Sequence, residues 1–317
     1  MPSLNVRPVL ATWILLVGTA VPSRAAELAL KPALLSEDGY SETFSVSSAM
    51  PDGWVQIQIV VTNIGPGSGR AVCRLMLSLP GLQWAEQTMI SPGDWAYRAP
   101  ELAVGACQAD PTHFVATTRQ GDRVEFKLES SHIPARVPTP RAGAPTAELE
   151  VALGDRPIPA TVTVTPREGP ARIYRNPAWL SHDLARQSLR QLGTHWVRFR
   201  STDTLPPIYG ILLAHTDTSD ATGWMAGDGL APAQISATGL TADAARGTES
   251  FGIRLTDTEI RMRPAASVLA FEPLRDMGLL GRVMGSIVGD PILSVIRVTW
   301  DSPSGQRQGV LETTVFR

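Results

Sequence analysis

The sequence has 317 residues and a net charge of −2, and charged residues make up 18% of it. This balance supplies neither the basic field that holds nucleic acid nor an acidic tail, so we expect no nucleic-acid partner. A chain of this length favours two domains over one compact core.

The first 26 residues have the pattern of a secretory signal peptide. Arg7 gives a positive start, and the apolar run Val9–Val21 is shorter than the about 20 residues that a membrane-spanning helix needs. Small residues at Ser23 and Ala25 offer a cleavage site. We expect residues 1–26 to be removed and the mature chain to be secreted or periplasmic. An anchor helix that stays attached is the alternative.

The stretch Gly53–Gly81 predicts two strands joined by a glycine-rich turn. Successive side chains of a strand point to opposite sides, so the first strand has an aliphatic face and a second, mixed face. The mixed face consists of Trp54, Gln56 and Gln58. The stretch His195–Arg200 predicts a similar strand. Its mixed face consists of Trp196, Arg198 and Arg200.

Cys73 and Cys107 are the only cysteines in the chain. In an oxidising compartment an even count predicts a disulfide, and two cysteines allow one intramolecular pairing. A redox or metal-binding pair is the alternative, but there is no C-x-x-C motif and the five histidines show no ligand spacing. We expect one structural disulfide, no metal and no cofactor.

Short runs punctuated by glycine and proline continue through the first half, as in all-β proteins. The proline-rich loop Ile133–Thr146 is interpreted as internal to the first domain, because a cut there would detach the two short strands that follow. The boundary is placed near Pro166–Pro170. The predicted domains are residues 27–168 and 169–317.

The second half opens with a predicted helix over Asn176–Gly193, where apolar residues recur at helical spacing. Within it Ser181, His182 and Asp183 offer the residue types of a catalytic triad. Consecutive residues point in different directions, so we expect no relay among them and solvent around Ser181 and Asp183. Short strands follow, and the whole pattern predicts an all-β fold of two antiparallel barrels or sandwiches.

The apolar stretch Met277–Gly289 lies between the last predicted strands. Packing across one end of a barrel is the simpler interpretation. A lid, or a transient contact with a membrane, is the alternative.

Three features of the first hairpin point to a known family: an E-T-F strand at Glu42–Phe44, an acidic-Gly turn at Asp52–Gly53 and a G-(aromatic)-V-Q strand at Gly53–Gln56. In these features Glu37–Leu79 resembles the first barrel of the double-lipocalin (calycin-like) family of survival-factor-type proteins, hydroxyneurosporene synthase (carotenoid hydratase) and fungal cyclases. The resemblance implies two lipocalin-like barrels side by side, with short helices in the second, and hydrophobic ligands in a lumen or at the interface. Enzymatic relatives tend to have an Asp-His pair where the second barrel begins. Arg175–Asn176 stands there in this chain, which favours binding over catalysis.

We therefore expect a binding protein for a hydrophobic small molecule, a lipid or an isoprenoid, held in hollow barrels. The candidate ligand-binding residues are Trp54, Gln56, Gln58, Trp196, Arg198 and Trp224. Trp224 is included because its glycine-rich surroundings predict a strand end near a barrel mouth. The two glutamines suit a partly polar cavity, or the seam between the barrels, better than a close-packed centre. The competing account places these faces against water or the partner barrel, around solid interiors.

Two other functions stay open, and the sequence does not fix the oligomeric state. A cofactor-free hydratase, isomerase or cyclase acting on an apolar polyene would need a proton donor in a dry pocket. It predicts that a carboxylate such as Asp183 or Glu249 faces the lumen beside aromatic residues. A surface interaction protein would instead have a solid core in each barrel.

Overall fold

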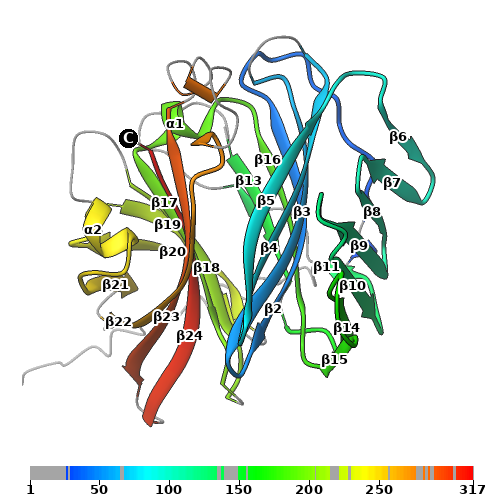
Figure 1. Cartoon of the computed structure of the whole chain (residues 1–317). Coiled ribbons are helices and arrows are strands. Elements are labelled where there is room, and N and C mark those ends of the chain that lie inside the picture. Colours follow the sequence, from blue (N-terminus) through cyan, green and yellow to red (C-terminus); the bar gives the residue numbers. More distant parts are fainter. Residues whose placement is uncertain are drawn as a thin grey trace, which may run out of the picture.

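The computed structural model shows two β-units that lie side by side (Figure 1). It describes residues 26–27, 29–64, 68–133, 137–138, 149–154, 156–203, 205–214, 221–227, 230–255, 258–275, 281–282, 285, 289–302 and 305–316. Over these residues the pairing between strands is antiparallel, so the predicted all-β class is confirmed. The predicted signal peptide lies outside the described residues, apart from Ala26, as does most of Met277–Gly289.

The N-terminal unit contains two seven-stranded sheets. Across the first sheet the strands are β12 (Val137–Pro138), β13 (Leu149–Leu153), β16 (Trp179–Ala185), β2 (Ser41–Met50), β3 (Gly53–Thr62), β4 (Arg70–Leu79) and β5 (Leu82–Ile90). Across the second they are β15 (Arg172–Arg175), β14 (Ala160–Thr165), β10 (Arg123–Leu128), β9 (His113–Thr117), β8 (Cys107–Asp110), β7 (Glu101–Val104) and β6 (Trp95–Arg98). A short pair is formed by β1 (Ala26–Glu27) and β11 (His132–Ile133).

The two sheets of this unit enclose one apolar core. The aliphatic face of β3 contributes Ile57, and Phe114 and Phe126 come from the second sheet; all three side chains are fully buried. Cys73 on β4 and Cys107 on β8 are joined by a disulfide with an S–S distance of 2.05 Å, which confirms the predicted bridge. The disulfide therefore ties one sheet to the other across the core.

The C-terminal unit is a closed eight-stranded barrel. Its strands are β17 (His195–Ser201), β18 (Ile208–Ala214), β19 (Ala221–Gly227), β20 (Leu230–Thr238), β21 (Phe251–Leu255), β22 (Thr258–Phe271), β23 (Pro291–Ser302) and β24 (Gly305–Phe316). Large apolar side chains such as Phe199 and Trp300, each 1% exposed, pack together in its core. The described helices are short: α1 (Leu189–Leu192) precedes the barrel, and α2 (Ala242–Ala245) follows β20.

The predicted helix over Asn176–Gly193 is wrong for most of its length. Trp179–Ala185 forms strand β16, which pairs with β2 on one side and β13 on the other, and only Leu189–Leu192 is helical. Hydrogen bonds to two neighbouring strands outweigh a helical spacing of apolar residues, because propensity is a weak local preference. One consequence is that Ser181 is fully buried, so the expected solvation of this side chain is also wrong.

The change from one unit to the other occurs after β16. The expected boundary lay between residues 168 and 169, whereas β15 and β16 are strands of the two N-terminal sheets and the closed barrel begins at His195.

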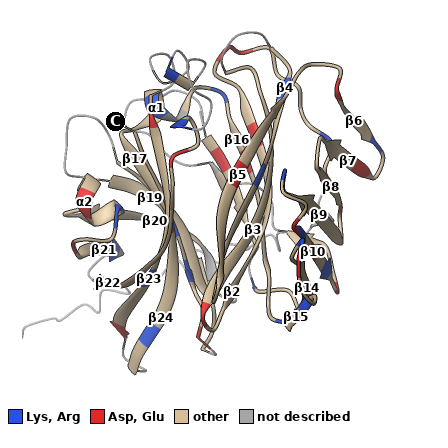
Figure 2. Cartoon of the chain, in the orientation of Figure 1, with Lys and Arg blue, Asp and Glu red and all other residues tan. Residues whose placement is uncertain are grey.

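Charges are distributed over both units. Figure 2 shows basic and acidic residues interspersed along the two halves, with no extended area of one sign on the described ribbon. None of the described helices has the length and hydropathy to cross a bilayer.

Candidate ligand-binding site

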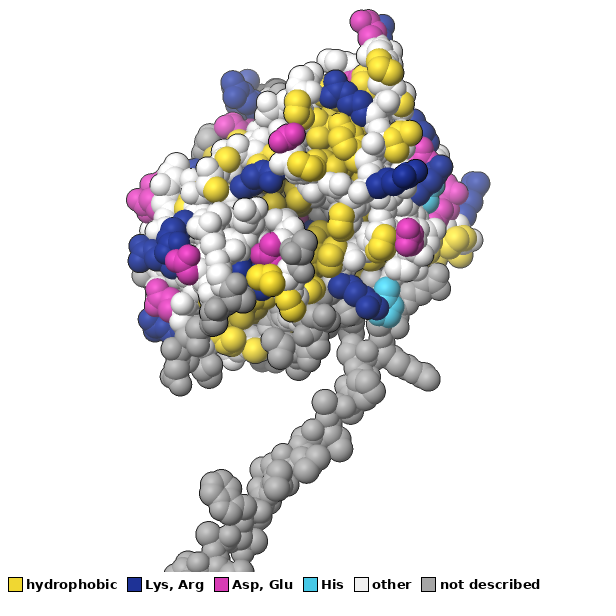
Figure 3. Space-filling model, turned by 90° about the horizontal axis from the view of Figure 1, so that it is seen from below, with side chains coloured by type: hydrophobic (Ala, Val, Ile, Leu, Met, Phe, Trp, Pro, Cys, Tyr) yellow, Lys and Arg dark blue, Asp and Glu magenta, His cyan; other side chains and the backbone are white. Residues whose placement is uncertain are grey.

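The mixed strand faces identified in the sequence meet at the seam between the two units. Because side chains alternate along a strand, Val197 and Phe199 enter the barrel core, while Trp196, Arg198 and Arg200 point the other way. On β3, the aliphatic face enters the N-terminal core in the same manner and leaves the mixed face to the seam. Figure 3 shows hydrophobic side chains gathered along the line where the units meet.

A partly open cavity of about 200 Å³ lies within this seam. One wall is the outer face of the first N-terminal sheet, and the other is formed by β17, β18, β23 and β24. Apolar lining residues include Val60, Val72, Met89, Ile211 and Leu293. The resemblance implied a ligand space either in a lumen or at the interface of the barrels. This cavity lies at the interface, and the interiors of both units are occupied by apolar clusters.

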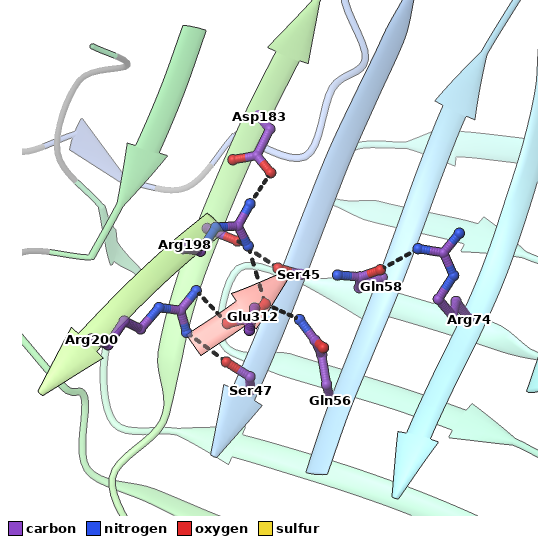
Figure 4. Close-up of polar contacts among 10 residues, drawn as sticks. Ser45, Ser47, Gln56, Gln58, Arg74, Asp183, Arg198, Arg200 and Glu312 are labelled. Carbon is purple, nitrogen blue, oxygen red and sulfur yellow. Dashed lines mark hydrogen bonds and ion pairs between the residues drawn. The ribbon is translucent and has the colours of Figure 1, made fainter. Parts of the chain in front are cut away.

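The polar side chains of the cavity include Gln58 on β3, Arg74 on β4, Gln87 on β5, Asp183 on β16 and Thr43 on β2. The arrangement of several of these groups is shown in Figure 4. The cavity therefore combines a mostly apolar wall with a few polar groups, as small-molecule sites usually do.

A buried ion network adjoins the cavity on the barrel side. Arg198 pairs with Asp183 across the seam and lies 3.4 Å from Glu312 Oε2 on β24. Arg200 Nη2 lies 3.2 Å from Glu312 Oε1, and its Nη1 donates to Ser47 Oγ at 2.6 Å. Gln56 Nε2 donates to Glu312 Oε2 at 2.8 Å. Two cations thus face two carboxylates in a desolvated interface (Figure 4).

Burial changes the acidity of this network. The pKa of Asp183 is raised because burial penalises the charged carboxylate, although the charge of Arg198 opposes the shift. Burial also lowers the pKa of Arg200 to about 10, against the opposing charge of Glu312. Arg200 therefore keeps its charge at neutral pH, whereas Asp183 holds a proton more readily than an exposed aspartate.

Arg74 has a different environment on the opposite wall. Its Nη1 donates to Gln58 Oε1 at 2.7 Å, and its Nε and Nη2 donate to Gln87 Oε1 at 3.3 and 3.1 Å. These contacts follow from strand register, because Arg74 lies directly opposite Gln58 on one side and Gln87 on the other. Two amide oxygens, both neutral, hold the guanidinium in place.

Two polar atoms of the cavity lining lack a hydrogen-bond partner among the described residues. Asp183 Oδ1 and Trp196 Nε1 are both buried and unpaired. An unsatisfied buried polar atom costs about 1–3 kcal/mol, so a ligand that supplies a donor and an acceptor would recover part of this loss.

The six candidate residues lie in different environments. Gln58 and Trp196 line the cavity, and Gln56 lines a smaller adjoining space of about 10 Å³ beside Glu312. Arg198 lies behind the wall in the ion network. Trp54 and Trp224 lie apart from the cavity. Trp54 belongs to an apolar cluster in the seam, and the Trp224 ring lies 6.1 Å from that of Tyr209.

Sequence reasoning missed Arg74, Gln87 and Glu312. Arg74 carried a detectable signal, because it alternates with the core-facing Cys73 and Leu75 and so shares the face of Gln58. Glu312 gave no such signal, since its partners lie more than a hundred residues away in the sequence. No group of three or more His, Cys, Asp or Glu side chains suited to a metal ion occurs in the described part of the chain.

No protein-family model and no curated protein sequence matches this chain. Solved structures resemble it in fold. A protein described as an AttH from Nitrosomonas europaea has 12% identity and a TM-score of 0.55, over 92% of this chain and 100% of that one. Kievitone hydratase from Nectria haematococca has 9% identity and a TM-score of 0.54, over 92% and 95%. CghA with Sch210972 has 12% identity and a TM-score of 0.50, over 94% and 93%. At these identities the likeness shows a shared fold.

Proposed function

We propose that this chain is a non-catalytic binding protein that holds a hydrophobic small molecule in the seam cavity. The observation that carries the proposal is a cavity of about 200 Å³ whose mostly apolar wall is interrupted by a few polar groups. Removing apolar surface from water is favourable by about 25 cal/mol per Å², so such a wall favours a hydrophobic guest. The partly open shape allows a ligand longer than the cavity to extend outward.

The fold likeness supports the same proposal. One of the similar structures is named as a complex with Sch210972, so a chain of this architecture is recorded with a small molecule. We extend the likeness to membership of the double-lipocalin family and to a lipid or isoprenoid ligand.

The disulfide agrees with an exported chain, since such bonds persist in oxidising compartments. Sequencing the N-terminus of the mature protein tests export, and an intact Met1 contradicts it.

Blocking the cavity tests the binding function. Val60 lines the cavity on β3, and Val60→Phe places a ring in the space that the ligand would occupy. We expect the affinity for the neutral fluorescent probe N-phenyl-1-naphthylamine to fall by at least about tenfold, equivalent to about 1.4 kcal/mol. The matched control is Ile173→Phe on β15, where the side chain is 67% exposed. Equal affinity in both variants would exclude the cavity as the binding site.

Catalysis is the second candidate function, and the position and acidity of Asp183 favour it. Its carboxyl group lines the cavity beside Trp196, has one unpaired oxygen and has a raised pKa. A protonated carboxyl in an apolar site can give its proton to a carbon–carbon double bond; water then adds to the resulting cation and returns a proton to the carboxylate. One similar structure is a hydratase by name.

Turnover separates the two candidates. The protein is incubated with a panel of apolar polyenes, and products heavier by one water are sought by mass spectrometry. The catalytic candidate predicts a product that disappears in Asp183→Asn while probe binding remains. A product that persists in Asp183→Asn contradicts the assigned role of Asp183, and the absence of product across the panel favours binding alone.

A further inference from the structure

Arg74 stands apart from the other buried arginines in its choice of partners. Among the described residues, the side chains of Arg198, Arg200 and Arg307 are almost completely buried, and each has a carboxylate within ion-pair distance. Arg307, for example, lies 2.8 Å from Asp203. Arg74 is partly buried at the cavity wall, and none of the ion pairs among the described residues involves it. Its partners are the side-chain oxygens of Gln58 and Gln87.

The charge of Arg74 is therefore uncompensated within its site. Burial lowers its pKa to about 10, so the guanidinium is still protonated at neutral pH. Moving a charge out of water is costly unless an opposite charge or several hydrogen bonds replace the solvent. The carboxamide oxygens supply part of that replacement but no negative charge.

Arg74 also has unused hydrogen-bonding capacity. A guanidinium has five N–H groups, and the three recorded bonds engage one on each nitrogen. One N–H therefore remains on each terminal nitrogen. The planar fork of arginine matches a carboxylate, and charge-assisted bonds of this kind are about twice as strong as neutral ones.

Asp183, the other charged side chain that lines the cavity among the described residues, does not neutralise Arg74. Asp183 lines the same space, but its carboxylate is engaged by Arg198 from the barrel side. Among the side chains drawn in Figure 4, Arg74 and Asp183 lie on opposite sides of strand β3, which carries Gln58. Beside Arg74 the wall continues with Val72, Met89 and Val60, which offer apolar contact to the remainder of a ligand.

We propose that the cavity selects amphipathic carboxylic acids, with the carboxylate bound by Arg74 between Gln58 and Gln87 and the hydrocarbon part against the apolar wall. This inference rests on the proposed binding function and adds the chemical class of the ligand. Gln58 and Gln87 act as positioning residues, because their amide oxygens fix the plane of the guanidinium.

The test compares decanoic acid with decanol, which share a chain and differ in the charged group. Displacement of N-phenyl-1-naphthylamine gives both affinities at pH 7.5 in the full-length mature protein. In the unmodified protein we expect the acid to bind more tightly by a factor of about ten to a hundred, the range of a hydrogen-bonded charge. In Arg74→Gln the preference should fall to about one while decanol affinity changes by less than about threefold. Arg175→Gln, an exposed position on β15, is the matched control and should keep the preference.

The outcomes separate the two proposals. Equal binding of acid and alcohol by the unmodified protein overturns the role of Arg74 and leaves the binding function intact, and this comparison needs no variant to fold. A preference for decanoic acid over decanol that survives in Arg74→Gln also overturns the role of Arg74. If neither ligand nor the probe binds, the proposed binding function fails, and the inference fails with it.

Discussion

The two ends of the seam are built on the same strands but differ in what fills them. At one end Trp54 packs with Met76, Leu269 and Val310, and the units are in close apolar contact. At the other end the same face of β3 presents Val60 and Thr62, and a cavity of about 200 Å³ remains. The large Trp54 side chain therefore marks the end where the units are in contact, and the smaller Val60 and Thr62 side chains mark the end where a cavity remains. The ion network lies between these regions and fixes the units against each other.

The largest effect is expected from removal of the carboxylate shared by the two seam arginines. Glu312→Ala leaves Arg198 with Asp183 alone and Arg200 without its carboxylate. Breaking a buried ion pair in this way costs about 3–5 kcal/mol in free energy of unfolding, measured by urea denaturation. The control is Asp301→Asn, which removes an exposed pair with Arg263 and should leave the denaturation midpoint unchanged. Similar losses in both variants would show that the network does not hold the seam.

Opening the closed end is expected to have the next largest effect. Trp54 is 1% exposed, and Trp54→Ala should lower the free energy of unfolding by about 3 kcal/mol, because the lost apolar contacts are not replaced. The same change should extend the cavity and allow longer apolar ligands to bind. Ile173→Ala on the exposed face of β15 is the control, with an expected change within about 0.5 kcal/mol. A Trp54→Ala protein with unaltered stability would contradict the close packing of this end.

The smallest expected effect concerns how the free energy of unfolding changes with pH. Two acidic residues on adjacent strands should contribute to this change with opposite signs. Glu42 is buried, which raises its pKa, but hydrogen bonds from His182, the Ala33 backbone and Tyr40 outweigh this and lower the pKa overall. Its contribution to stability is present above the pKa of the unfolded state and is lost as the pH falls through the folded value. Asp183 has a raised pKa, so its contribution falls as the pH rises from near 3.8 towards the folded value.

Measuring unfolding from pH 3 to pH 7 distinguishes these signs. The destabilisation caused by Glu42→Gln should grow as the pH rises, whereas Asp183→Asn should become more stable relative to the unmodified protein over the same interval. If the free energy of unfolding changed with pH in the same way in both variants, the two carboxyl groups would occupy equivalent environments.

Much of the seam could be predicted from alternation along single strands. The mixed face of β3 was identified from Trp54, Gln56 and Gln58, and the pairing of Cys73 with Cys107 followed from their number and expected compartment. Local patterns carry this information because each strand face has one chemical character. Local patterns do not show which face of the second unit packs against the mixed face of β3. The position of the cavity between the units was therefore visible only in the structure.

Two further features depended on tertiary pairing. β16 has apolar residues at helical spacing, and only its hydrogen bonds to β2 and β13 make it a strand. This pairing brings Asp183 to the seam, where Arg198 meets it. Within the ion network, Glu312 meets Gln56 and Arg198 from more than a hundred residues away, so no local pattern identifies it.

A crystal structure of the protein with 10-bromodecanoic acid tests the central claim most directly, because bromine marks the ligand by its anomalous signal. We predict density between the first N-terminal sheet and the barrel, with the carboxylate in hydrogen-bonding distance of Arg74 and the bromine in or at the mouth of the seam cavity. Density inside the core of either unit, or on the outer surface of the second sheet, would contradict a ligand site at the seam.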